Sequence, residues 1–191
     1  MPDYKKIADY FFEAGALKYK KRSGWWVAGI DNPESIAEHS HRTALIAFVL
    51  AKLEGADADK AAAMSVFHDL PEARITDLHK VAQHYIDSTE AEDLAARHQS
   101  EQLPESVGAG LLAMFREFNA QKTAEAIIAK DADLLEVALQ GKEYFDNGCK
   151  KCREWFERAG KELKTESAKK IFKEAMKSDG VWWKGLKAKI R

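Results

Sequence analysis

Two histidines and two aspartates are the side chains of this sequence best suited to hold a metal ion: His39, His68, Asp69 and Asp133. Imidazole nitrogens and carboxylate oxygens together suit a divalent ion such as manganese, cobalt, iron, nickel, zinc or magnesium, and they do not select one of these. Four protein ligands leave positions open for water on a metal that prefers six. The set therefore predicts metal-assisted hydrolysis, with water as the nucleophile.

Short connections place three of these residues near one another. His39 lies near the first turn of a helix that a Ser-x-x-Glu capping box opens at Ser35. The pair His68-Asp69 stands at the end of the next apolar helix. Because only residues 55–57 join the two helices, we expect them to pack antiparallel, with the start of one beside the end of the other.

The fourth residue, Asp133, lies in the apolar face of a later helix. A carboxylate between Ala132 and Leu134 is costly to bury unless a metal ion, an arginine or a lysine compensates its charge. Each residue of the set is a weak signal alone. A His-Asp dipeptide occurs by chance, His39 could face solvent, and Asp131 could replace Asp133 as the ligand.

Composition limits the other possibilities. The 191 residues suffice for one core, and the net charge of −1 gives no basic field for a nucleic acid polymer. The longest apolar run, 44–51, is far shorter than the roughly 20 residues that cross a membrane, and no targeting signal is recognised. We therefore expect a cytoplasmic protein, with Cys149 and Cys152 as reduced thiols.

Hydrophobic periodicity predicts an all-α chain without repeats or linkers. The long segment 123–145, which carries Asp133, is apolar on one face. A loop is expected over 21–34 and a charged connector over 71–77. The predicted helices cover about 3–19, 35–55, 57–70, 77–86, 89–101, 105–119, 123–145, 150–164 and 166–178.

Three motifs resemble the HD-domain superfamily: AEHSHRTALIA, FHDLPEARITDL and AKDADLLEVAL. The resemblance covers about residues 3–145 and is nearest to the 5′-deoxynucleotidase branch. It implies one HD-domain helical bundle over 1–191, with the metal site between 35 and 135 in its core. Within the motifs it selects His39 over His41 and Asp133 over Asp131.

The same resemblance implies roles for other residues. Glu72 matches the catalytic carboxylate, Arg22 an arginine that holds the phosphate, and Asp77 a carboxylate that contacts the sugar. An aromatic side chain after the arginine packs on the deoxyribose. Trp25 is our choice for it, with Trp26 as the alternative. The resemblance also implies a homodimer, and the helices of 146–191 are expected to cover the core or a partner subunit.

Three functions compete at this point. The first is removal of the 5′-phosphate from deoxynucleoside monophosphates, with the small nucleotide as substrate. The second is another HD phosphohydrolase activity, on a nucleoside triphosphate, a cyclic nucleotide or an alarmone. The third is a nucleotide-binding protein without turnover, against which the intact ligand set and Glu72 argue.

Overall fold

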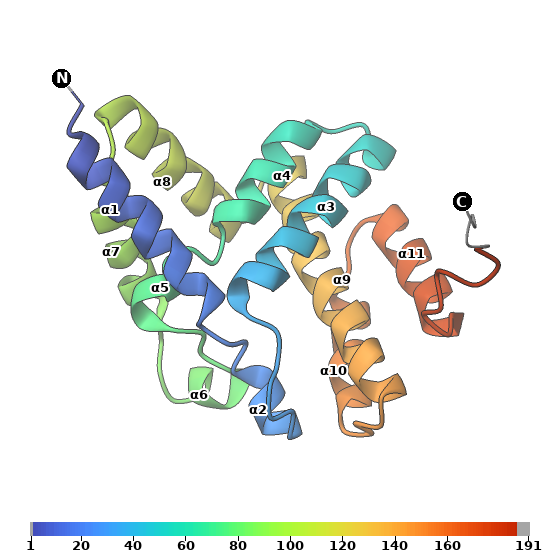
Figure 1. The fold of residues 1–191 in the computed structure, drawn as a ribbon. Helices are drawn as coiled ribbons and strands as arrows, with labels where there is room; N and C mark the ends of the chain where they lie inside the picture. The colour runs from blue at the N-terminus through green and yellow to red at the C-terminus, as the bar shows by residue number, and fades with distance from the viewer. Residues whose placement is uncertain (1, 187–191) are drawn as a thin grey trace, which may run out of the picture.

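The computed structural model describes residues 2–186, and within this range the chain is built from helices without a β-strand. The predicted all-α class is therefore confirmed. Three helices occupy the middle of the molecule (Figure 1). They are α3 (Ile36–Glu54), α4 (Ala58–Phe67) and α9 (Ala124–Asp146).

Capping residues in the sequence determine where the central helices begin and where α3 ends. The Ser35 hydroxyl accepts the Glu38 N–H, and the Glu38 carboxylate accepts the Ser35 N–H, so the predicted capping box opens α3. Gly55 ends α3 in the left-handed region at φ 75°. Asp57 caps α4 and Thr123 caps α9 in the same way, through a side-chain oxygen.

The main core forms where α3, α4 and α9 meet. Ala47, Leu50, Ala61, Ile128 and Leu135 are almost completely buried there. Alanine at several of these contacts lets the helix backbones approach closely. This core fixes how α3 and α9 lie against one another.

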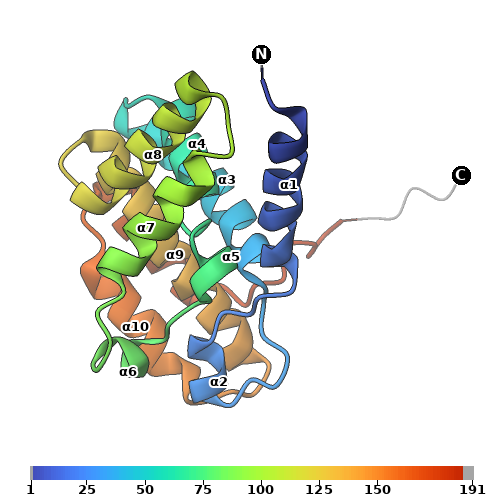
Figure 2. The same ribbon diagram turned by 90° about the vertical axis from the view of Figure 1, so that its left-hand side faces the viewer.

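The remaining helices flank this centre on two sides. Figure 2 shows α5 between α1 and α7, and Arg74 of α5 donates to Glu13 of α1 at 2.6 Å. On the other side α10 and α11 pack on α9. The flanking elements are α1 (Tyr4–Gly15), η1 (Ala16–Lys18), α2 (Gly24–Ala28), α5 (Glu72–Ile75), α6 (Lys80–Gln83), α7 (Thr89–Ser100), α8 (Glu105–Ala120), α10 (Cys152–Glu162) and α11 (Glu166–Lys177).

The expected C-terminal helices are present as α10 and α11. Leu163 and Ala168 belong to the main core, so this region covers the core.

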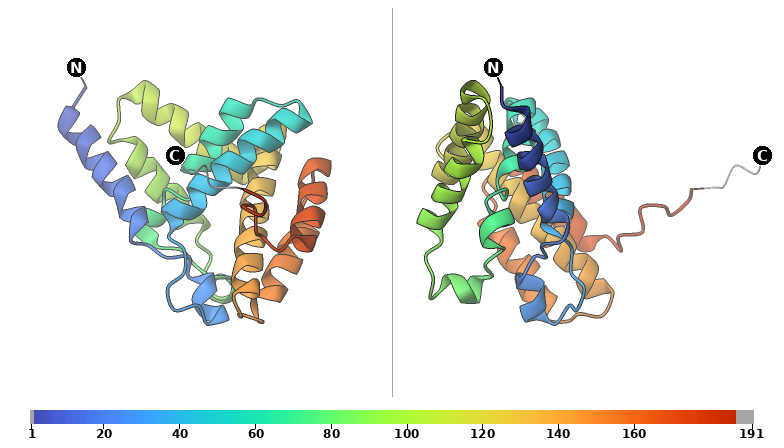
Figure 3. Two further views of the ribbon diagram at one scale, coloured as in Figure 1. Left: turned by 45° about the vertical axis from the view of Figure 1, so that its right-hand side comes forward. Right: turned by 60° about the vertical axis from the view of Figure 1, so that its left-hand side comes forward.

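Cys149 and Cys152 are free thiols with their sulfur atoms 2.8 Å apart. After α11 the chain leads away from the helices (Figure 3), and Trp182 there is exposed.

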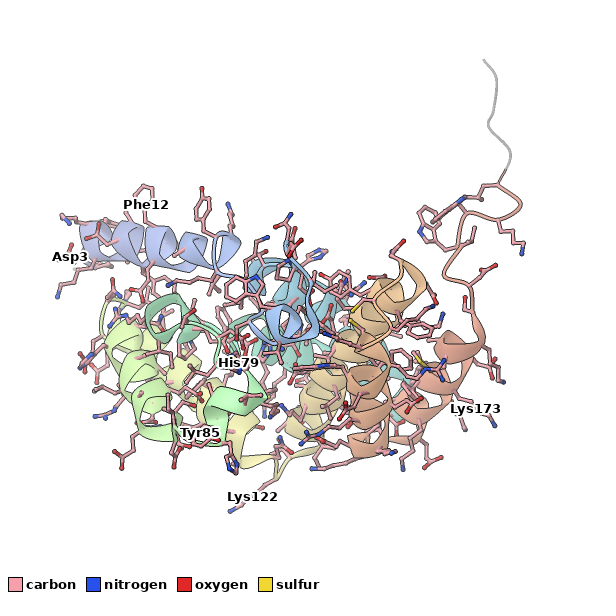
Figure 4. All side chains as sticks on the ribbon, turned by 90° about the horizontal axis from the view of Figure 1, so that it is seen from below. Asp3, Phe12, His79, Tyr85, Lys122 and Lys173 are labelled. Carbon is pink, nitrogen blue, oxygen red and sulfur yellow. The ribbon has the colours of Figure 1, made fainter. Side chains whose placement is uncertain are left out.

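The prediction of one helix over 77–86 was wrong. Residues 77–79 are irregular, and only the short α6 follows, with His79 as its N-cap (Figure 4). The physical reason lies in Thr76 and Asp77. Thr76 has φ 65°, which no helix accommodates, and Asp77 accepts the N–H of Ser23 from a distant segment. The predicted loop 21–34 in turn contains the short α2.

None of the helices within residues 2–186 combines the length and the apolar character that crossing a membrane requires.

Candidate metal centre and active site

The four predicted ligands converge where the first turn of α3 and the end of α4 meet the middle of α9. The ligand atoms of His39, His68 and Asp69 all lie within 4.8 Å of one another. Asp133 joins them, since its Oδ1 is 3.2 Å from His39 Nε2. His39 is fully buried and His68 and Asp133 nearly so. The structure thus brings together side chains from three separate segments of the chain.

His68 is oriented toward this cluster by its own backbone. Its Nδ1 lies 2.7 Å from the Ser65 carbonyl oxygen, which only accepts, so Nδ1 carries a proton. Nε2 is buried without a hydrogen-bond donor and faces the Asp69 carboxylate at 3.1 Å. A lone pair directed at a carboxylate is repelled by it unless a cation lies between them. The donor set at this point therefore fits a divalent metal.

The charges of the cluster lead to the same conclusion. Arg22 donates to Asp69 at 2.9 Å, and Lys130 donates to Asp133 at 2.7 Å. Burial raises the pKa of the Asp69 carboxyl, but the positive charge beside it, with Arg22 at 2.9 Å, outweighs burial and lowers the pKa below its usual range. Asp77, whose Oδ1 is 3.8 Å from Arg22, adds a third carboxylate, so the aspartates outnumber the two fixed cations and suit a further positive charge.

Glu72 lies in the first turn of α5, three residues after Asp69. Its Oε2 is buried without a hydrogen-bond partner. Burial and the negative charge of Asp69 raise the pKa of Glu72 well above its usual value. A carboxyl group that is enclosed, unpartnered and next to the predicted metal ligands has the properties of a proton donor or acceptor.

Arg22, Asp77 and the α2 segment form one wall of the site. The Arg22 Nη1 is 3.8 Å from Asp77 Oδ1. The Ser23 N–H donates to the Asp77 carboxylate, and the Ser23 hydroxyl donates to the Asp77 backbone carbonyl at 3.0 Å. These contacts fix the segment that carries Arg22, so its guanidinium faces the predicted ligands.

The two tryptophans of α2 lie in different surroundings. Trp25 is buried against Tyr144 and Trp155, and its indole N–H donates to Glu34 Oε1 at 2.9 Å. Trp26 is 54% exposed. In this arrangement Trp25 holds α2 against α9 and α10. Its packing on a deoxyribose stays a prediction.

Sequence reasoning missed the residues on the other side of His39. Its Nδ1 lies 2.5 Å from Oε2 of Glu136, which is fully buried and pairs with Arg42. Burial and Arg22 disfavour a charged imidazole, but Glu136 and Asp133 outweigh them and raise the pKa of His39 to about 10. The spacing of three between Asp133 and Glu136 puts both on one helix face and was the available signal.

The residues that were alternative candidates for metal ligands lie outside the cluster. Asp131 is buried away from the cluster, where its carboxylate accepts the N–H groups of Lys164 and Thr165 before α11. His41 is exposed on α3. The remaining histidines make no part of the cluster: His79 caps α6, and His84 and His98 are exposed.

A model of the HD domain family matches residues 14–176. The chain belongs to the HD-domain family. It is 30% identical over 148 residues to the human protein 5′-deoxynucleotidase HDDC2, covering 74% of this chain and 70% of the human one. The Dictyostelium discoideum protein of the same name is 32% identical over 146 residues, covering 71% and 76%.

A solved structure has a similar fold. A conserved hypothetical protein from Pyrococcus furiosus superposes with a TM-score of 0.74 at 34% identity, covering 90% of this chain and 99% of that one. The segment that the HD-domain model matches, residues 14–176, contains every predicted ligand. The protein is therefore a hydrolase of the HD type with a candidate metal-binding cluster in its core.

Proposed function

We propose that this HD domain is a divalent-metal-dependent phosphomonoester hydrolase that removes the 5′-phosphate from deoxynucleoside monophosphates. The observation that carries the proposal is the buried cluster of His39, His68, Asp69 and Asp133, with Arg22 and the unpartnered Glu72 beside it. The names of the human and Dictyostelium relatives support the substrate class.

The four clustered side chains would hold the metal. When bound, it supplies Lewis-acid chemistry, polarising a phosphoryl oxygen and making water a better nucleophile near neutral pH. Every other task falls to side chains of the protein. Arg22 presents a planar fork of N–H donors that suits a phosphate, and its contacts with Asp69 and Asp77 aim this fork at the ligand cluster.

Glu72 moves the proton. Its unpartnered Oε2 is free to take a proton from the attacking water or to give one to the departing 5′-oxygen. Burial of the cluster excludes bulk water, which strengthens the attraction between Arg22 and the phosphate.

Asp77 would orient the sugar. Its carboxylate already accepts the Ser23 N–H, and its other oxygen is able to accept a hydrogen bond from a 3′-hydroxyl. A 2′-hydroxyl enclosed without a partner costs about 1–3 kcal/mol, roughly a 5- to 150-fold loss of rate. We therefore predict that deoxynucleoside monophosphates are preferred over ribonucleoside monophosphates, with little dependence on the base. If Trp25 packs on the sugar, Trp25→Ala reduces this preference.

Phosphate release from a nucleotide panel tests the proposal. Protein stripped with a chelator is reloaded with manganese, cobalt, nickel, zinc or magnesium in turn, and assayed on dAMP, AMP, dATP and cyclic AMP. Glu72→Gln serves as the control for contaminating phosphatases. We expect activity only after metal is added, and faster on dAMP than on AMP. Equal rates on the two would refute the sugar selection, and turnover of dATP or cyclic AMP alone would replace the substrate class.

A further inference from the structure

An ion pair with a fully buried carboxylate, Glu136, and a partly exposed guanidinium, Arg42, lies directly behind His39, on the side away from the metal cluster. Glu136 is on α9, three residues beyond Asp133, and is 0% exposed. Its Oε2 lies 2.5 Å from His39 Nδ1. Its Oε1 accepts two hydrogen bonds from Arg42, from Nε at 2.9 Å and from Nη2 at 2.7 Å. Both oxygens are thus engaged, and one of them with a predicted metal ligand.

Arg42 also donates hydrogen bonds to two further side chains of α9, Gln140 and Glu143. Its Nη1 donates to Glu143 at 2.9 Å, and its Nη2 donates to Gln140 at 2.9 Å. Arg42 follows His39 by three residues on α3, whereas its three acceptors are spaced along α9. A buried carboxylate without a counter-charge would be costly, so Arg42 is what allows Glu136 to remain ionised.

This contact determines which nitrogen of His39 faces the metal. A carboxylate only accepts hydrogen bonds, so the nitrogen facing Glu136 must carry a proton. Metal binding requires the other nitrogen, Nε2, to give up its proton, so the proton held on Nδ1 leaves the Nε2 lone pair for the metal. The Nε2 atom is 3.2 Å from Asp133 Oδ1 and 3.6 Å from Asp69 Oδ2, inside the cluster of predicted ligands. Glu136 therefore acts on both the tautomer and the direction of the ring.

We propose that Glu136, held by Arg42, is a positioning residue that fixes the tautomer and orientation of His39 for metal binding. The proposal rests on the metal site of the proposed function. Carboxylates that accept the second N–H of a metal-binding histidine typically contribute 10- to 100-fold in metal affinity. We expect an effect of this size from Glu136.

A purely structural pair between α3 and α9 is the competing explanation. Such a pair would change the stability of the fold and leave the affinity of the folded protein for metal as it was. It would also leave the His39 ring nitrogens unaffected. The experiment must therefore read metal affinity and the ring itself, as well as stability.

The test compares Glu136→Gln with Glu143→Gln. Both remove one negative charge from the partners of Arg42 without changing side-chain size, but Glu143 is half-exposed and has no contact with His39. Zinc affinity is measured by calorimetric titration of chelator-stripped protein. The Nδ1 proton of His39 is observed by nitrogen-correlated NMR in the metal-free protein, with unfolding curves recorded in parallel.

We expect Glu136→Gln to bind zinc 10- to 100-fold more weakly and to shift the Nδ1 proton signal of His39. Glu143→Gln should change neither. Arg42→Gln provides a second variant if Glu136→Gln folds poorly, and it should weaken zinc binding in the same direction. Unchanged affinity in Glu136→Gln, or an equal loss in Glu143→Gln, overturns the proposal. If the wild-type protein binds no metal, the proposed function fails, whereas the Nδ1 signal still decides whether Glu136 fixes the ring.

Discussion

Thr76, the residue before Asp77, has backbone angles that only glycine adopts freely. Its φ is 65° and its ψ is 162°, in a region that is essentially restricted to glycine. A β-branched side chain makes this conformation worse. The Thr76 side chain is exposed, and its N–H donates to the Glu72 carbonyl at 2.9 Å. Replacement by glycine removes the side chain and keeps this backbone hydrogen bond.

The expected gain in stability follows from two opposing contributions. A residue held in such a region costs on the order of 1–3 kcal/mol. Glycine at the same position increases the entropy of the unfolded chain, which offsets about 0.4–1 kcal/mol. Thr76→Gly should therefore stabilise the protein by roughly 1 kcal/mol, which for a chain of this size corresponds to about 2–4 °C in Tm.

Thermal unfolding of chelator-treated protein measures this gain, because bound metal would add its own stabilisation. Thr76→Ala is the matched control, since it removes the same exposed atoms but keeps the β-carbon that strains the backbone. We expect Thr76→Gly to unfold at higher temperature than both the wild type and Thr76→Ala. If the glycine variant is no more stable than the alanine variant, the argument from backbone strain is refuted.

Three further predictions concern the site and the pH dependence of stability. Asp69→Ala should lose both bound metal, measured by elemental analysis, and phosphate release; full occupancy and turnover in this variant would place the site elsewhere. Glu72→Gln should keep the metal while turnover falls by about two to four orders of magnitude, and loss of metal would instead make Glu72 a ligand. The hydrogen bond from Arg74 lowers the pKa of Glu13 from 4.5 to about 2, so this contact stabilises the fold above pH 4.5 and is lost as the pH falls toward 2. Over that interval urea titration should show the wild type losing more stability than Glu13→Gln, by on the order of 2 kcal/mol; parallel losses would contradict the assignment.

The sequence predicted the parts of the site that depend on local signals. The capping box at Ser35 sets the start of α3 and with it the place of His39. The short connection after Gly55 brings His68 and Asp69 back to that end. Each of these inferences needs only a few consecutive residues and the geometry of a helix, which is why they agree with the structure.

The parts that could not be predicted depend on partners far along the chain. Asp77 breaks the expected helix because it accepts a hydrogen bond from Ser23, 54 residues away. The spacing of Glu136 from Asp133 puts both on one helix face, but it does not reveal the partner of Glu136, Arg42, which is 94 residues away. No periodicity within one segment contains this information, since it arises only when the segments pack.

The packing of α3 on α9 brings the locally predicted residues together with their partners from distant segments. Ala47 and Ala132 are fully buried in the same core cluster, and such small side chains let the two helices approach closely. Short side chains then suffice to span the gap, so Asp133 reaches His39 from one side and Glu136 reaches it from the other. Because Asp133 and Glu136 are neighbours on one face of α9, a single helix sets both the distance to the imidazole and its orientation. The alanine-rich core is thus the element that gives the candidate metal centre its geometry.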